Sequence, residues 1–257
     1  MKAFIHQITL KGKRESNQDR ICIKQSNNEL IIGVYDGHGV YGDFVSSHLK
    51  KHFINGANNL NDKKELQEYI YNYQYNLGKY KQSKESGSTL LMMKINLKNR
   101  KTLTVNLGDC RAIIGYNEKV LQLTNDHKVD DENERVPLMI NNANVEYDYE
   151  DEMFRVDGYA VSRAMGNKLY KSISQKADIY SHEFSKNSKY IVLACDGLWD
   201  SMTNADVNKL ILNNLESVKF NSHQTQSGKN NIAYLLAKQA IKSGSQDNVS
   251  VVVVLLS

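Results

Sequence analysis

Acidic residues stand beside apolar runs at widely separated points of the chain. One apolar run ends at Asp36, a second ends at Asp196, and a third begins shortly after Asp247. Short apolar runs bounded by turn-forming residues are typical of buried strands. The ends of such strands would hold these carboxylates at the edge of a sheet, and clustered carboxylates are the ligands that hard divalent cations prefer.

The segment 36–39 contains further groups that could serve such a cation. Gly37 and Gly39 flank His38, allow a tight turn and leave the backbone carbonyl groups accessible. A carboxylate beside an accessible carbonyl suits a metal ion, and His38 is placed to transfer a proton next to it. The alternative is a loop with a solvated Asp36 and a surface histidine. This segment alone does not distinguish the two, but the recurrence of the pattern favours a metal site.

Length and charge narrow the class of protein. The 257 residues allow one large domain or two small ones, and they suffice for a sizeable core. The formal net charge is +4, and the dispersed lysines are typical of a solvated surface rather than a nucleic-acid-binding patch. No apolar run approaches the ~18 residues of a membrane span, and the first residues lack a signal-peptide pattern. We therefore expect a soluble protein of the cytoplasm or nucleus that binds neither nucleic acid nor membrane.

The three cysteines, Cys22, Cys110 and Cys195, are far apart in the sequence. Their number and spacing argue against a disulfide framework, and no pair has the spacing of metal ligands. Cys110 and Cys195 lie in apolar surroundings, so we expect them to be buried thiols in a reducing compartment.

The hydrophobic periodicity predicts groups of strands separated by pairs of helices. Such separated groups indicate an α+β fold rather than alternating βαβ units, and two antiparallel sheets covered by helices would satisfy the order. Asp62 is expected to cap a helix, Asn55 and Gly56 to end the preceding one, and Pro137 to bend or break a third. The predicted strands are 4–10, 20–24, 30–35, 89–95, 102–106, 111–116, 119–122, 179–184, 190–195 and 248–256; the predicted helices are 43–54, 62–81, 130–142, 203–215 and 230–243; 145–156 is expected to be irregular, 162–171 a short helix or loop, and 219–229 a polar linker.

Taken in order, several segments resemble the metal-dependent serine/threonine protein phosphatases of the 2C type, the PPM family. The agreement covers nearly the whole chain and keeps the order of the family's motifs, which makes it specific although each motif alone is weak. The matching segments are 12–19, 36–39, 86–90, 105–112, 123–128, 160–166 and those around Asp196 and Asp247.

The resemblance implies a central β-sandwich of two antiparallel sheets flanked by α-helical layers, and one catalytic domain over residues 1–257. It implies hydrolysis of phosphoserine and phosphothreonine in phosphoprotein substrates by a metal-activated water. The implied cofactors are two Mn²⁺ or Mg²⁺ ions per subunit with a weaker third, because paired divalent ions can deprotonate a shared water and neutralise phosphate oxygens. A monomer is the expected state.

The resemblance also implies a ligand set. Asp36 would bridge the two ions, Asp196 and Asp247 would complete the first site, and the Gly37 carbonyl would serve the second. Gln18 and Asp19 stand where many relatives carry Glu-Asp. Gln18 can still offer a carbonyl oxygen but no charge, so the second site would rely more on Asp19, directly or through water.

Arg14 resembles the arginine that binds the substrate phosphate, because its planar guanidinium suits two phosphate oxygens. The alternative for a lone arginine is a surface charge. His38 resembles the general acid that protonates the leaving oxygen. Asp126 and Asp200 resemble acids that hold the third ion with Asp196, although Asp126 could equally belong to a structural turn.

Other matched residues are interpreted as scaffolding. Asp109 and Arg111 are expected in a polar turn, where they could pair, and Trp199 in the core. Ser162 and Arg163 either fix the cleft or serve only the scaffold.

A further departure from the family lies near the end of the 160–166 motif. Asn167 replaces an Asp found in many relatives, and no metal role is assigned to it. The segment 167–189, where the family carries a flap beside the cleft, is short.

Two other functions fit the same fold. A pseudophosphatase would bind a partner without turnover, and a small-molecule phosphatase would act on another substrate. Inactive relatives usually lack one of the metal aspartates, whereas Asp36, Asp196 and Asp247 are all present together with Arg14 and His38. The sequence therefore favours an active protein phosphatase.

Overall fold

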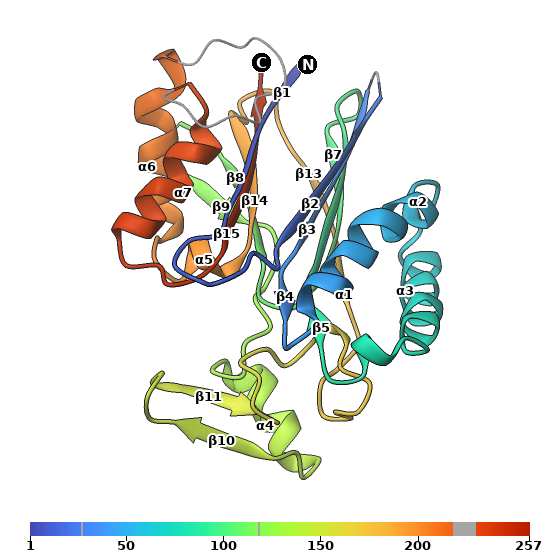
Figure 1. The fold of residues 1–257 in the computed structure, drawn as a ribbon. Coiled ribbons are helices and arrows are strands. Elements are labelled where there is room, and N and C mark those ends of the chain that lie inside the picture. Colours follow the sequence, from blue (N-terminus) through green and yellow to red (C-terminus); the bar gives the residue numbers. More distant parts are fainter. Residues whose placement is uncertain (27, 118, 218–229) are drawn as a thin grey trace.

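The computed structural model describes residues 1–26, 28–117, 119–217 and 230–257. The predicted polar linker at 219–229 lies outside these residues. Two five-stranded sheets pack face to face, and helices cover their outer faces (Figure 1). Every pairing within the two sheets is antiparallel, so the predicted α+β sandwich is confirmed.

The two sheets differ in where their strands come from. The first sheet joins the start and the end of the chain, whereas the second is built mainly from its first half. The order in the first sheet is β1 (Ala3–Leu10), β15 (Val249–Leu256), β14 (Tyr190–Ala194), β8 (Arg111–Gly115) and β9 (Val120–Gln122). The order in the second is β13 (Asp178–Glu183), β7 (Lys101–Leu107), β6 (Leu90–Asn96), β3 (Glu29–Tyr35) and β2 (Arg20–Gln25).

Helices cover each sheet on the side away from the sandwich core (Figure 1). The first sheet is covered by α5 (Asp196–Trp199), α6 (Asn204–Asn214) and α7 (Ile232–Lys242). The second is covered by α1 (Gly42–His48), a π-helical turn (Leu49–Phe53), α2 (Ile54–Ala57) and α3 (Lys63–Leu77). None of the described helices is long and apolar enough to span a membrane.

Strand β15 shows why the apolar runs in the sequence are continuous. Val252 and Val254 pack between the sheets, whereas Val251 and Val253 pack under the helices. Successive side chains of a strand point to opposite faces, and both faces of this strand are buried. The sequence therefore has no polar alternation here.

A small unit extends from one end of the sandwich (Figure 1). It contains α4 (Glu132–Ile140) and a hairpin of β10 (Val145–Asp148) and β11 (Met153–Val156). The prediction of irregular structure at 145–156 was therefore wrong. Pro137 lies inside α4, and the helix continues past it to Ile140, so the proline does not end the helix.

The boundaries of the first helical region also differ from prediction. Asn55 and Gly56 do not end it, because the chain stays helical through α2. A Cβ on Gly56 would lie 2.2 Å from the Tyr69 hydroxyl, so glycine serves close packing there. The predicted cap is confirmed, since the Asp62 carboxylate accepts the Lys64 N–H at 2.8 Å. The following helix ends at Leu77, earlier than expected.

Close backbone packing joins the loops that follow β14 and precede β15. A Cβ added to Gly197 would lie only 1.9 Å from the Asn248 carbonyl oxygen. These two residues follow Asp196 and Asp247 directly, so this contact sets how near the two acids lie.

Gly197→Ala should therefore destabilise the protein by roughly 2 kcal/mol or more, because the added methyl group forces the two loops apart. Denaturant unfolding of both proteins measures the difference. Ser201→Ala, which removes a hydroxyl that donates to the Gly197 and Leu198 carbonyl groups but adds no atom between the two segments, is the control and should change stability less. Equal stability of Gly197→Ala and the unmodified protein would contradict the packing argument.

Candidate metal and phosphate site

Both sheets bring carboxylates to the same end of the sandwich. Asp19 precedes β2 and Asp36 follows β3, and these strands are neighbours in the second sheet. Asp196 follows β14 and Asp247 precedes β15, which are neighbours in the first sheet. Antiparallel pairing places the end of one strand beside the start of the next, so Asp36, Asp196 and Asp247 meet at one cleft of about 440 Å³, with Asp19 buried close to them.

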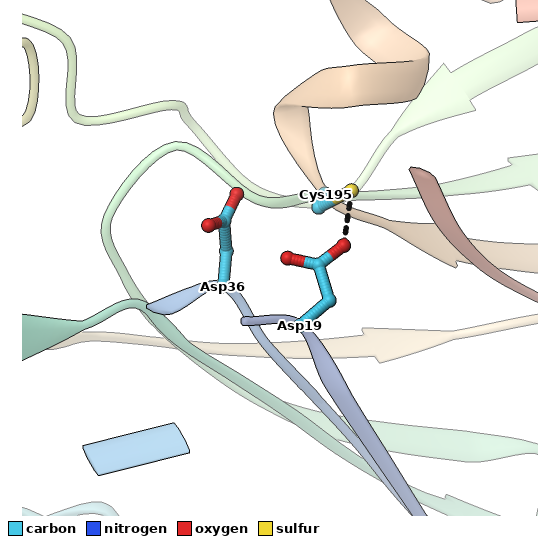
Figure 2. A group of neighbouring side chains, drawn as sticks. All are labelled: Asp19, Asp36 and Cys195. Carbon is cyan, nitrogen blue, oxygen red and sulfur yellow. Dashed lines mark hydrogen bonds between the residues drawn. The ribbon is translucent and has the colours of Figure 1, made fainter. Parts of the chain in front are cut away.

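Within the cleft, Asp36, Asp196 and Asp247 contribute to the lining. Asp19 is only 1% exposed and lies next to Asp36, as Figure 2 shows. The acids predicted from the strand ends are thus brought together by the fold.

Burial and mutual repulsion raise the pKa values of this cluster. Burial raises the pKa of Asp36 well above its ordinary value, and the charges of Asp196 and Asp19 add to the effect. Burial, with the charges of Asp196 and Asp247, raises the pKa of Asp19 to about 7. Burial, with the charges of Asp200 and Asp247, raises the pKa of Asp196 to about 6. The cluster therefore favours binding of protons or cations.

Arg14 lies at the cleft and makes a two-point contact with an acid. Its Nε donates to Asp247 Oδ1 at 3.0 Å and its Nη2 donates to Asp247 Oδ2 at 2.7 Å. The side chain is 60% exposed, so the guanidinium stays accessible from solvent. This fork geometry is the one that binds two oxygens of a carboxylate or a phosphate.

Gln18 and Gly37 lie side by side at the cleft, and close contacts explain both residue types. A Cβ on Gly37 would lie 2.4 Å from the Gly42 carbonyl oxygen, so no larger residue fits. The Gln18 side-chain amide donates to the Gly39 carbonyl at 3.0 Å. A glutamate could not donate this hydrogen bond. The glutamine that departs from the family pattern therefore makes a contact with Gly39 that the family's usual residue cannot make.

His38 contacts Asn167, a residue to which the sequence analysis assigned no role. Residues Gly37–His38 form β4, which pairs with β5 (Gly87–Ser88). His38 Nε2 lies 2.7 Å from Asn167 Oδ1, and Asn167 is 1% exposed with a left-handed φ of 49°. Burial lowers the pKa of His38, whereas the contact with Asn167 opposes that effect. The only sequence signal for Asn167 was its departure from the family's Asp.

The residues expected around a third ion are not all at the cleft. Asp126 forms an ion pair with Arg111, with 2.6 Å between Oδ2 and Nη2. Arg111 therefore pairs with Asp126 rather than with Asp109, the partner suggested in the sequence analysis. Asp200 is exposed and forms an ion pair with Lys128. Asp109, which was interpreted as scaffolding, instead lines the cleft with Asp196 and is 3% exposed. Burial first, and then the charge of Asp196, raises its pKa well above the ordinary value.

The side of the cleft facing the small unit is formed by residues that precede the predicted flap. Arg155, Tyr159 and the adjoining residues up to 161 line it, and no residue of 167–189 does. The expected position of the flap was therefore wrong. Sequence reasoning missed this segment because its hairpin was not predicted.

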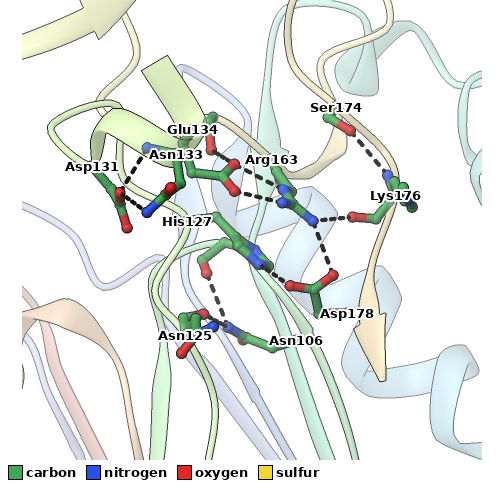
Figure 3. A network of polar contacts seen from close by, with 12 residues as sticks. Asn106, Asn125, His127, Asp131, Asn133, Glu134, Arg163, Ser174, Lys176 and Asp178 are labelled. Atoms are coloured by element: carbon green, nitrogen blue, oxygen red, sulfur yellow. Dashed lines mark hydrogen bonds and ion pairs between the residues drawn. The ribbon is translucent and has the colours of Figure 1, made fainter. Parts of the chain in front are cut away.

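A polar network anchors the small unit to the sandwich (Figure 3). Arg163 donates to Glu134 of α4 at 2.8 Å and pairs with Asp178 of β13 at 3.2 Å. His127 Nε2 lies 3.1 Å from Asp178 Oδ2, while His127 Nδ1 accepts the Gly108 N–H at 3.0 Å. Arg163 is thus structurally tied to the loop that carries Asp109.

Comparison with known proteins identifies the relatives of the chain. Residues 7–249 match the family described as Protein phosphatase 2C. The chain belongs to this family. It is 31% identical over 95% of its length to "Probable protein phosphatase 2C 55" of Oryza sativa subsp. japonica, and 30% identical over 95% to "Probable protein phosphatase 2C 69" of Arabidopsis thaliana. The chain spans 64% and 67% of the length of these protein phosphatase 2C relatives.

Solved structures share the same fold. The serine-threonine phosphatase 2C from Toxoplasma gondii superposes with a TM-score of 0.78 at 20% identity, covering 99% of this chain and 95% of that one. A sex-determining protein of C. elegans superposes with a TM-score of 0.83 at 22% identity, covering 100% of this chain and 65% of that one. These similarities confirm the protein phosphatase 2C architecture.

Protein phosphatase 2C enzymes are metal-dependent, and the acidic cluster fits a divalent cation. Asp19 Oδ1 and Asp196 Oδ1 are buried and have no hydrogen-bond partner among the described residues. An unpartnered buried carboxylate oxygen is costly unless a proton or a cation compensates it. The carboxylate oxygens of this cluster suit Mg²⁺ and Mn²⁺.

The raised pKa of Asp19 predicts a pH dependence of stability in excess chelator. Its pKa is about 7 in the folded protein and about 3.9 in an unfolded chain, so the folded state binds more protons between these values. The free energy of unfolding should therefore fall as pH rises from about 4 to about 7. Asp19→Asn cannot lose a proton and should flatten this fall.

Denaturant unfolding in chelator across this pH range measures the effect. Glu68→Gln, which changes an exposed acid of α3, is the control and should follow the unmodified protein. Parallel pH curves for Asp19→Asn and the unmodified protein would show that Asp19 does not titrate as described.

Proposed function

We propose that this protein phosphatase 2C member hydrolyses phosphoserine and phosphothreonine in phosphoproteins, with Mn²⁺ or Mg²⁺ as cofactor. The observation that carries the proposal is the arrangement of one cleft: carboxylates from both sheets form one part, and the accessible Arg14 guanidinium lies beside them. A phosphate bound by Arg14 would lie next to the acidic cluster. We further propose that residues 1–257 act as one catalytic domain in a monomer.

The proposed ligands are the acids of the strand ends. Asp36 would contact two ions, Asp196 and Asp247 the first, and the Gly37 carbonyl the second. Bound divalent ions supply a nucleophilic water at neutral pH and neutralise the charge of the phosphate. Gln18 and Asp19 support the second site in this proposal.

For a weaker third ion, the cleft favours a revised ligand set. Asp109 lies at the cleft beside Asp196, whereas the Asp126 carboxylate is occupied by Arg111. Asp200 would have to leave Lys128 to contribute. We therefore propose Asp109 in place of Asp126.

Arg14 would bind the phosphate through the donors that now contact Asp247. Two parallel N–H groups match two phosphate oxygens as well as they match the two carboxylate oxygens. Transfer of the guanidinium from Asp247 to a phosphate leaves the carboxylate free to serve a cation. The two contacts thus exclude each other at the same side chain.

His38 would donate a proton to the leaving alkoxide of serine or threonine. Asn167 holds the ring by its 2.7 Å contact with Nε2 and cannot take the proton itself, because it is an amide. Burial lowers the pKa of His38, and the negative charge of a bound phosphate would oppose this and favour the protonated ring.

Activity toward a phosphothreonine peptide tests the proposed function. It should require added Mn²⁺ or Mg²⁺ and disappear in excess chelator. Asp36→Asn should abolish turnover, because it removes charge from the residue proposed to contact both ions. Asp43→Asn, at an exposed acid of α1, is the control. Full activity in chelator would refute the metal mechanism, and a folded protein inactive on all phosphopeptides would indicate a binding module.

Leaving-group dependence tests His38. His38→Gln should reduce turnover of a phosphopeptide on the order of 10²-fold, the contribution typical of a general acid. It should affect p-nitrophenyl phosphate far less, since p-nitrophenolate leaves without a proton. His52→Gln, at an exposed histidine of the π-helical turn, should affect neither substrate. Equal losses on both substrates at saturating Mn²⁺ would remove His38 from the acid role.

A further inference from the structure

The ring of Tyr159 lies against the ring of His38 in the cleft. The two ring centroids are 5.2 Å apart, the ring planes make an angle of 56°, and both residues line the cleft. Aromatic rings pack favourably at centroid distances of about 4.5–7 Å. Tyr159 follows β11 of the small unit, whereas His38 belongs to β4 of the sandwich. The contact therefore joins the two parts of the molecule beside the proposed proton donor.

Tyr159 is itself held by several contacts. Its hydroxyl donates to the backbone carbonyl of Glu85, and its ring packs edge-on against Tyr170, with 5.3 Å between the centroids and 68° between the planes. Its backbone exchanges two hydrogen bonds with Val156, at 2.8 and 2.9 Å, which joins it to the end of β11. These contacts fix both the backbone and the far end of the side chain, so the ring is held in one orientation.

The segment that anchors the Tyr159 hydroxyl also holds the backbone of His38. Glu85 lies two residues before Gly87, which pairs with His38 between strands β5 and β4. A Cβ on Gly39 would lie 3.0 Å from the Glu85 carbonyl oxygen, so the turn that follows His38 packs on the same carbonyl. The position of one ring relative to the other is therefore set by a single short segment.

The His38 ring needs this second contact because its hydrogen bond involves one atom only. Nε2 lies 2.7 Å from Asn167 Oδ1, but the χ2 angle of a histidine has a broad distribution, so one contact leaves the tilt of the ring loosely set. Proton transfer requires a heavy-atom distance of about 2.6–3.2 Å to the leaving oxygen. A misplacement of about 1 Å can reduce a rate on the order of 10²-fold. Packing against Tyr159 restricts this tilt.

We propose that Tyr159 is a positioning residue for His38, which orients the imidazole ring toward the leaving oxygen of the substrate. Tyr159 supplies no proton itself, because its hydroxyl proton is donated to the Glu85 carbonyl. The proposal rests on the proposed function, since it concerns the residue that protonates the leaving alkoxide. Its effect is therefore confined to substrates whose leaving group needs a proton.

Tyr159→Leu removes the ring and the hydroxyl but keeps an apolar side chain. It should lower kcat for a phosphothreonine peptide on the order of 10-fold and change KM by less than about threefold, because the ring orients the proton donor and does not bind the phosphate. Turnover of p-nitrophenyl phosphate should change by less than about twofold, since this leaving group needs no proton. Tyr159→Phe, which keeps the ring and loses the hydrogen bond, should have a smaller effect.

Tyr149→Leu is the matched control, because this tyrosine lies in the same hairpin, is 85% exposed and packs only on Tyr147 among the described aromatic rings. It should change neither activity. A double-mutant cycle then shows whether Tyr159 acts through His38. In a His38→Gln background, Tyr159→Leu should cause no further loss on the phosphopeptide. Equal losses in both backgrounds, or equal losses on both substrates, would overturn the proposal, because a merely structural role gives these results.

Nuclear magnetic resonance separates this proposal from the proposed function. In protein labelled with ¹³C-histidine, the His38 signal is the one that His38→Gln removes. Tyr159→Leu should shift this signal, because an aromatic ring in contact with His38 alters the local magnetic field, whereas Tyr149→Leu should not. An unmodified protein that is inactive on both substrates would refute the proposed function, and the shift would still support the placement of His38 by Tyr159. An unchanged His38 signal in Tyr159→Leu would overturn the inference whatever the activity.

Discussion

Repulsion among buried carboxylates is the constraint on which this structure depends. Asp19, Asp36 and Asp196 stand at strand ends whose register is fixed by the hydrogen-bonded ladders of two separate sheets. The ladders set where the backbone carries these acids, and their charges penalise one another in a poorly solvated cleft. The pKa of Asp19, raised to about 7 by burial and its acidic neighbours, is one expression of this conflict. The fold itself therefore creates affinity for whatever neutralises the cluster.

Basic residues of the chain form ion pairs only with the outer acids. Arg14 contacts Asp247, Arg111 contacts Asp126, and Lys128 contacts an exposed acid at the start of the α5–α6 connection. No such partner reaches Asp19 or Asp36 among the described residues. The three basic side chains contact acids at or outside the rim of the cleft, whereas Asp36 lines the cleft itself and Asp19 is buried next to it. The division between outer and inner acids separates structural ion pairs from candidate metal ligands.

The features that could be predicted from the sequence are those with a local physical signal. An apolar run followed by an acid shows where a buried strand ends, so Asp36 and Asp196 were identified as acids at strand ends. A capping carboxylate such as Asp62 forms its contacts within three residues, so the helix cap was predicted as well. The hairpin at 145–156 has no such signal, because its side chains are mostly part-exposed and show no clear alternation. Gly56 was misinterpreted as the end of a helix. A glycine is needed there because Tyr69 of another helix packs against it, and the local sequence does not reveal that contact.

Which acid faces the cleft is a different kind of question, since it depends on partners from other strands. The sequence motifs suggested Asp126 for the third ion and a scaffolding role for Asp109, whereas in the structure Arg111 pairs with Asp126 and Asp109 lines the cleft. Asn167 reaches His38 from a segment 129 residues away. An ion pair that forms only in the folded chain can thus reverse the role suggested by a motif. Candidate ligands taken from a motif should therefore be checked first for a basic side chain that already neutralises them.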